Sequence, residues 1–211
     1  MTKTYDKTYY LTKLGELSPT VDQIRLMMAA LRRAFNRSKM AELEVLPKLQ
    51  DNITLDLDEF FEDVELAQGE PGQAQNPYLI KLQGILGHLE HIANEFNLMA
   101  EPVQRKIKES LIIPDKDFFH VNDLFVHVKG LLRGLADLFH AVNPPLRRYL
   151  LGQAEHIQAH CFQAATEHET TMSHSFGHPQ AFAVYFEIME RFKKILGHLT
   201  ALVQLMTKKG H

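Results

Sequence analysis

The sequence predicts an all-α protein in which two tandem antiparallel three-helix units pack as one elongated six-helix bundle. Two observations indicate the class and a third the organisation. Apolar residues recur at alternating spacings of three and four over long segments, and no segment shows the period-two alternation of a half-buried strand. A five-residue sequence also recurs 110 residues further along the chain. With 211 residues, 45% of them hydrophobic, the chain is long enough to bury a substantial core.

Three apolar stripes are the strongest helical signal. They run from Tyr78 to Met99, from Phe118 to Val142 and from Phe182 to Met206. Residues at spacings of three and four share one face of a helix, so each segment must bury that face against neighbouring helices.

The first two helices are placed by prolines near their starts. Ser18 followed by Pro19 indicates an N-cap and a first-turn proline, which predicts a helix over 18–37. The second helix is expected over about 39–67, and Pro47 is close enough to its start to kink it rather than end it.

The other four helices are also bounded by prolines. The third is predicted over about 77–110, where Pro102 bends or interrupts it. The last three begin near Pro114, Pro144 and Pro179. Helices of this length with short connections pack antiparallel to their neighbours in bundles.

An internal repeat divides the chain. The sequence Ile-Leu-Gly-His-Leu occurs at 85–89 and again at 195–199, each time in the third helix of its half. We therefore predict an N-terminal extension over 1–17, a first three-helix repeat over 18–112 and a second over 113–211. The glycines of the repeated sequence, Gly87 and Gly197, lie in mid-helix at a cost of about 1 kcal/mol each relative to alanine. They are expected to mark a close crossing of helices.

This organisation resembles the PhoU family, whose third helix carries a run like E-R-I-G-D-H-A-x-N-I-A. Residues 83–93 and 193–203 align with that run, and residues 50–54 and 154–158 align with an E-D-E-I-D-like run in the family's second helix. The resemblance covers nearly the whole chain from about Ser18. It implies a regulator without enzymatic activity that modulates phosphate transport or signalling. It also implies binding to a phosphate transporter or sensor kinase, as a homo-oligomer.

The acidic residues of the family's motifs are missing here. In the family, acids four residues apart place two carboxylates on one helix face, where they bind multinuclear metal clusters. Non-acidic residues stand at the corresponding positions: Gln83 and Gly87, Lys193 and Gly197, Gln50 and Thr54, Ala154 and Gln158. We expect the family's metal site to be lost or rebuilt.

Histidines near these positions suggest an alternative function, a bundle that binds a divalent or iron-type metal ion. His156 and His160 are four apart, the separation at which two imidazoles reach one zinc ion. His88 and His91 share a helix face, and a bundle can bring His198 close to them. The candidate ligands are His88, His91, Glu155, His156, His160 and His198. The competing interpretation is that these side chains lie on helix flanks and bind nothing.

Composition excludes several other classes. The net charge is −3. Two pairs of adjacent arginines occur, at 32–33 and 147–148, but they lie far apart in the sequence, so no basic cluster suggests a nucleic-acid partner. No apolar stretch of about 18 residues occurs, so no membrane insertion is expected. The N-terminus lacks a signal-peptide pattern, which favours the cytoplasm.

A single cysteine, Cys161, excludes an internal disulfide framework and is expected to be a buried thiol. No phosphate-binding loop or nucleophile elbow appears.

Overall fold

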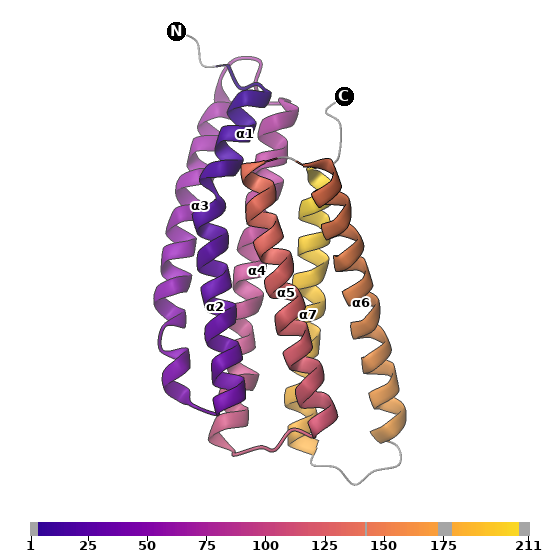
Figure 1. The fold of residues 1–211 in the computed structure, drawn as a ribbon. Coiled ribbons are helices and arrows are strands. Elements are labelled where there is room, and N and C mark those ends of the chain that lie inside the picture. Colours follow the sequence, from indigo (N-terminus) through magenta and orange to yellow (C-terminus); the bar gives the residue numbers. More distant parts are fainter. Residues whose placement is uncertain (1–3, 142, 173–178, 207–211) are drawn as a thin grey trace.

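The computed structural model describes residues 4–141, 143–172 and 179–206, without the side chains of 160 and 162–172. The described residues form helices and no strands, which confirms the predicted all-α class. The elements are α1 (Lys7–Glu16), α2 (Ser18–Arg37), the 3-10 helix η1 (Met40–Leu43), α3 (Leu46–Gly69), α4 (Pro77–Lys108), α5 (Asp115–His140), α6 (Pro144–Met172) and α7 (Pro179–Leu205). Figure 1 shows the long helices side by side along the axis of an elongated bundle.

The six long helices of the described ranges pack against one another both within and between the two halves of the chain. Helices α2, α3 and α4 contact one another, and so do α5, α6 and α7. The two halves of the chain meet where α4 packs on α7, the most extensive interface among the described residues, and where α2 packs on α5. Figure 1 shows α2 and α5 in front of α4 and α7, with α3 and α6 at the two outer edges. The apolar faces of all the helices therefore line one continuous core.

Local sequence explains why α4 begins where it does. The Asn76 side chain accepts a hydrogen bond from the backbone N–H of Tyr78 at 2.9 Å, and Pro77 occupies the first turn. The helix then continues through Pro102, which lies inside it and is buried. The predicted span of 77–110 is thus confirmed to within two residues.

The structure corrects two expected helix starts. The second predicted helix divides into η1 and α3, and Pro47 lies in the first turn of α3 instead of kinking a longer helix. Ser18 is the first residue of α2 and not its N-cap, because the preceding Leu17 has helical backbone angles (φ −79°, ψ −9°) and connects α1 directly to α2.

Residues 1–17, expected as an extension, contain a helix that is part of the bundle. The Asp6 carboxylate caps α1 by accepting from the backbone N–H groups of Thr8 (2.8 Å) and Tyr9 (3.1 Å). Tyr10 and Leu14 are buried, and α1 contacts α2, α4 and α5. Its ten residues offer too short a stripe for the helical period to be conspicuous in the sequence.

The close crossing expected at Gly87 and Gly197 is wrong. A Cβ atom added at either glycine would meet nothing within 4 Å, because both lie on partly exposed faces of their helices. Close approach occurs instead at Gly84, where an added Cβ would lie 2.8 Å from Leu205 Cδ1, and at Gly134, where it would lie 2.5 Å from Leu150 Cδ2.

None of the helices in the described ranges combines the length and the apolar character that crossing a lipid bilayer requires.

Candidate functional site

Three of the candidate histidines meet at the seam between α4 and α7. Nδ1 of His88 lies 3.1 Å from Nδ1 of His198, and the ring of His91 stacks on that of His198 with centroids 4.8 Å apart and planes at 24°. Because one Nδ1 must donate and the other accept, the short contact requires different protonation at the two facing nitrogens. The sequence repeat has thus placed its two histidines in direct contact.

One pair of contacts along this seam is related by the offset of the repeated sequence. The helices are antiparallel, since Glu95 pairs with Arg191 while the later Arg105 pairs with the earlier Glu187. His88 and His198 are 110 residues apart. With the same offset, Gly84 is equivalent to Lys194, and Glu95 is equivalent to Leu205. The Gly84–Leu205 contact and the Glu95–Lys194 ion pair (3.6 Å) are therefore equivalent positions of the two repeats. One is apolar and the other charged.

The charged half of the seam is organised around Glu95. Its side chain is only 11% exposed, and it accepts from Arg191 at 3.0 Å and pairs with Lys194 at 3.6 Å. Two cations on α7 therefore compensate one nearly buried carboxylate, which is the arrangement that makes such burial tolerable.

Both histidines of the repeated sequence favour the neutral state. Partial burial, and then the charge of His91, lower the pKa of His88 below its ordinary value. The pKa of His198 is lowered first by burial and then by His91 and His88, while the Glu95 carboxylate acts in the opposite direction. Burial penalises the imidazolium form, and like charges in contact add to the penalty.

The metal-site hypothesis receives little support from this arrangement. His88, His91 and His198 come together, but Glu155 and His156 are exposed on α6, and the side chain of His160 lies outside the described residues. Within the described part of the chain, no group of three or more His, Cys, Asp or Glu side chains is placed to hold a metal ion. The three histidines instead interact with one another by a hydrogen bond and by ring stacking.

Neutral or basic residues stand at the positions that the resemblance aligns with acids, and several of them have hydrogen-bond or ion-pair partners. Gln50 Nε2 donates to Thr54 Oγ1 at 3.3 Å, and Gln68 Nε2 donates to Gln83 Oε1 at 3.5 Å. Lys193 pairs with Glu190 at 3.4 Å. Amide, hydroxyl and ammonium groups thus stand where the resemblance places carboxylates, the ligands that hard metal ions prefer.

Cys161 is the buried thiol that the sequence predicts. It is 2% exposed, and burial raises its pKa to about 12. A thiol with such a pKa stays protonated at neutral pH, and the thiolate is the nucleophilic form. Cys161 is therefore not set up as a catalytic nucleophile.

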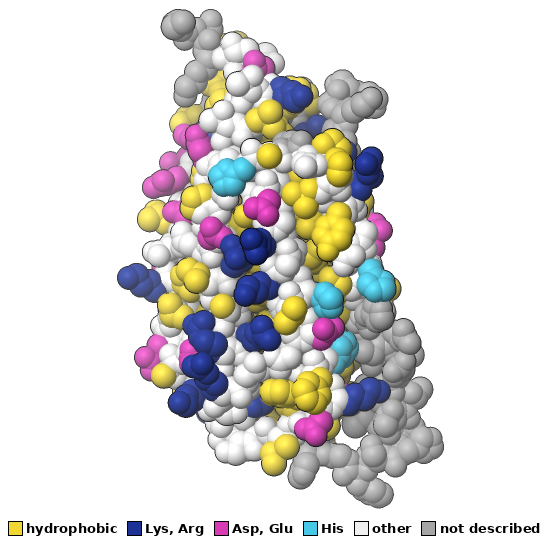
Figure 2. All heavy atoms as spheres, in the orientation of Figure 1, with side chains coloured by type: hydrophobic (Ala, Val, Ile, Leu, Met, Phe, Trp, Pro, Cys, Tyr) yellow, Lys and Arg dark blue, Asp and Glu magenta, His cyan; other side chains and the backbone are white. Residues whose placement is uncertain are grey.

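A second candidate site, which we call the basic groove, lies between α2 and α5. Figure 2 shows Lys and Arg side chains gathering over the lower half of α2 and its seam with α5. The cations that line the groove are Arg25, Arg32 and Arg33 from α2 and Lys129 from α5. The expectation that no basic face forms is therefore wrong. The sequence contained one signal of this groove. Arg25 and Arg32 are seven residues apart, a spacing that places both on one face of a helix.

Comparisons with known proteins identify the fold. No family model matches the sequence, and no curated protein matches it. Among solved structures, the chain is similar to the crystal structure of PhoU from Pseudomonas aeruginosa, with a TM-score of 0.78 and 14% sequence identity. The similarity covers 95% of this chain and 97% of that one. The chain therefore has a PhoU-like fold along nearly its whole length.

Proposed function

We propose that this PhoU-like chain is a regulatory adaptor that modulates phosphate transport or phosphate signalling through protein–protein contacts. It acts in the cytoplasm, as a homo-oligomer and without enzymatic activity, by binding a phosphate transporter or the sensor kinase that responds to phosphate. The observation that carries the proposal is the PhoU-like fold over 95% of the chain, together with the PhoU-like runs in the third helix of each half. We infer further that 18–112 and 113–211 are two copies of one unit, which the equivalent contacts of α4 and α7 support.

The surface supports a role in binding proteins. Large apolar side chains stand exposed on α2 and α5, namely Leu26, Phe119 and Val126, and Leu26 is also a lining residue of the basic groove. Apolar side chains exposed together and rimmed by charge are typical of surfaces that contact other proteins. A regulator that docks on a partner needs such a face, whereas a catalyst needs convergent acid, base and nucleophilic groups.

The proposal is tested in cells that carry a tagged copy of the chain, grown at low and at high phosphate. We expect a component of a phosphate transporter or a sensor kinase to co-purify with the chain, and phosphate uptake or the phosphate response to change when the gene is deleted. Re-expression of the wild-type chain should restore both. If neither protein co-purifies after cross-linking, and uptake and the phosphate response are the same with and without the gene, the proposal is wrong.

A further inference from the structure

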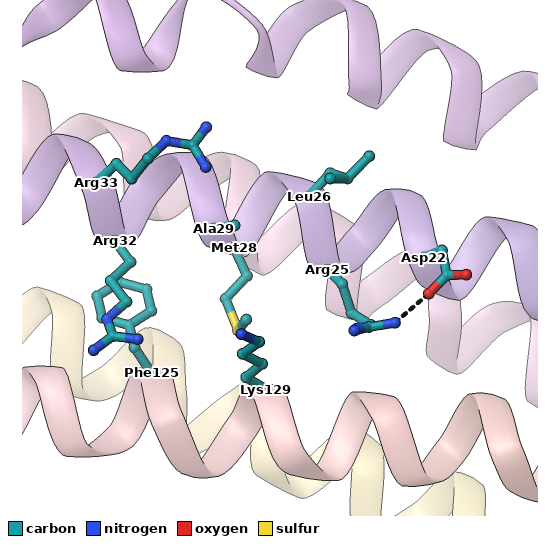
Figure 3. Close-up of a pocket in the computed structure, with 9 residues that line it drawn as sticks. All are labelled: Asp22, Arg25, Leu26, Met28, Ala29, Arg32, Arg33, Phe125 and Lys129. Atoms are coloured by element: carbon teal, nitrogen blue, oxygen red, sulfur yellow. Dashed lines mark hydrogen bonds and ion pairs between the residues drawn. The ribbon is translucent and has the colours of Figure 1, made fainter.

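The basic groove is a cavity of about 460 Å³ that opens to solvent between α2 and α5. In Figure 3, Arg25 and Arg32 extend from α2 toward α5 and Lys129 extends from α5 toward α2, whereas Arg33 lies on the side of α2 away from α5. Buried Met28 and Phe125 lie between the cations. Three cations from two helices therefore line one apolar-floored space, in which Asp22 is the one acidic lining residue.

The arginines of the groove are held in place but only partly neutralised. Arg25 pairs with Asp22, while its buried Nε atom has no hydrogen-bond partner among the described residues. Arg32 Nε donates to Asn122 Oδ1 at 3.3 Å, and Asn122 is itself fixed by exchanging two 2.8 Å hydrogen bonds with Asn36. The asparagine pair holds the guanidinium of Arg32 through Nε, and Arg32 is a lining residue of the groove.

Arg33 borders the groove, but its guanidinium is engaged by a carboxylate outside it. It pairs with Glu42 at 2.7 Å, and Arg37 pairs with the same carboxylate at 2.9 Å. These two arginines are thus engaged on the side of η1. The positive charge that is open to a ligand comes from Arg32 and Lys129, with Arg25 shared with Asp22.

We propose that the basic groove binds the phosphoryl group of a small anionic ligand. A phosphoryl group carries about −1.5 to −2 charges at neutral pH and three acceptor oxygens, so it can be approached from both helices at once. A planar carboxylate offers two oxygens in one plane, which suits a single arginine fork. The cavity is also within the range of about 300–1,000 Å³ that small-molecule sites occupy, which is larger than a lone phosphate ion needs. The phosphoryl group therefore belongs to a larger molecule, either a soluble phosphorylated compound or a lipid headgroup.

The test measures binding to two probes by the full-length chain. Isothermal titration calorimetry with pyrophosphate reports on a soluble source of the phosphoryl group. Co-sedimentation with phosphatidylcholine vesicles, with and without phosphatidic acid, reports on a lipid source. We expect one of the two probes to bind, and Arg32→Gln and Lys129→Gln each to weaken binding about tenfold or more, because each removes a charged hydrogen-bond donor.

Arg148→Gln is the matched control, because Arg148 is an exposed arginine on α6, away from the groove. Circular dichroism of every variant checks that the fold is kept. Binding that persists in Arg148→Gln and is lost in Arg32→Gln supports the proposal, and the probe that binds identifies the source. The proposal is overturned if neither probe binds, or if Arg148→Gln weakens binding as much as Arg32→Gln does. These outcomes do not depend on whether the chain regulates phosphate transport.

Discussion

His88 and His198 occupy the same position in two repeats of one sequence and lie in contact, with their Nδ1 atoms 3.1 Å apart. Two identical side chains of the repeated sequence therefore face each other across the seam between α4 and α7. Two identical groups cannot both donate in one hydrogen bond. One Nδ1 atom must therefore carry the proton while the other accepts it, so the two side chains differ in protonation although they are identical in sequence. Both side chains also have a lowered pKa, and this gives the first prediction.

Stability should fall as the pH is lowered through the titration of these histidines. In the unfolded chain their pKa is near the ordinary value of 6.5, and in the folded chain it is lower, so the unfolded chain binds more protons below about pH 6.5. The free energy of unfolding should therefore decrease from about pH 7 down to the lowered folded-state pKa values. Thermal melts between about pH 7.5 and pH 5 measure this slope.

The double variant His88→Asn, His198→Asn should flatten that slope, since asparagine keeps a hydrogen-bonding group near Nδ1 and does not titrate. His140→Asn is the control, because His140 is exposed at the end of α5. A slope that is equally steep in the double variant and in the wild type would contradict the prediction.

Glu95→Gln should destabilise the fold by about 1–2 kcal/mol. The change removes the charge from a nearly buried carboxylate that accepts from Arg191 and pairs with Lys194, and hydrogen bonds to charged groups contribute about 1.5–3 kcal/mol. Glu90→Gln, at an exposed position of the same helix, should change stability by less than about 0.5 kcal/mol. Urea unfolding compares the two, and equal losses would show that the ion pairs are not the cause.

Replacing glycine by alanine should have opposite effects on stability at two positions. Gly87→Ala should stabilise the fold by about 1 kcal/mol, because alanine is the better helix former and its Cβ meets open space. Gly134→Ala should destabilise it by about 1–2 kcal/mol, because the new Cβ overlaps buried Leu150 and the core must shift. Chemical denaturation of both variants checks the order. Finding Gly134→Ala the more stable of the two would refute the close packing of α5 on α6.

Leu14→Ala should cost about 2–5 kcal/mol, the range for truncating a fully buried leucine. Leu14 is fully buried although it lies in the segment that the sequence suggested was an extension. Leu66→Ala is the matched control, since Leu66 is 74% exposed on α3, and it should change stability by less than about 0.5 kcal/mol. Thermal melts distinguish the two, and a Leu14→Ala variant as stable as the control would show that α1 does not support the core.

Local signals account for the accurate parts of the sequence prediction. The start of α4 at Pro77, with its capping Asn76, depends on residues next to each other in the chain, and so does the buried stripe that runs through Phe96. Where several residues compete, local signals are insufficient. Pro47 is compatible with a kink in a long helix and with the first turn of a new one, and the tertiary structure selects the second by breaking the chain at η1.

By itself the sequence determined the helical class, the helices beginning at Pro77 and Pro179, and the recurrence of His88 as His198. Each of these follows from spacing along one chain, because a helix face is defined by residues three and four apart. Only the tertiary structure decided that the two histidines touch and that Arg32 and Lys129 line one groove. Such contacts depend on which faces of distant helices meet, and that is set by the packing of the whole core rather than by any local run of residues.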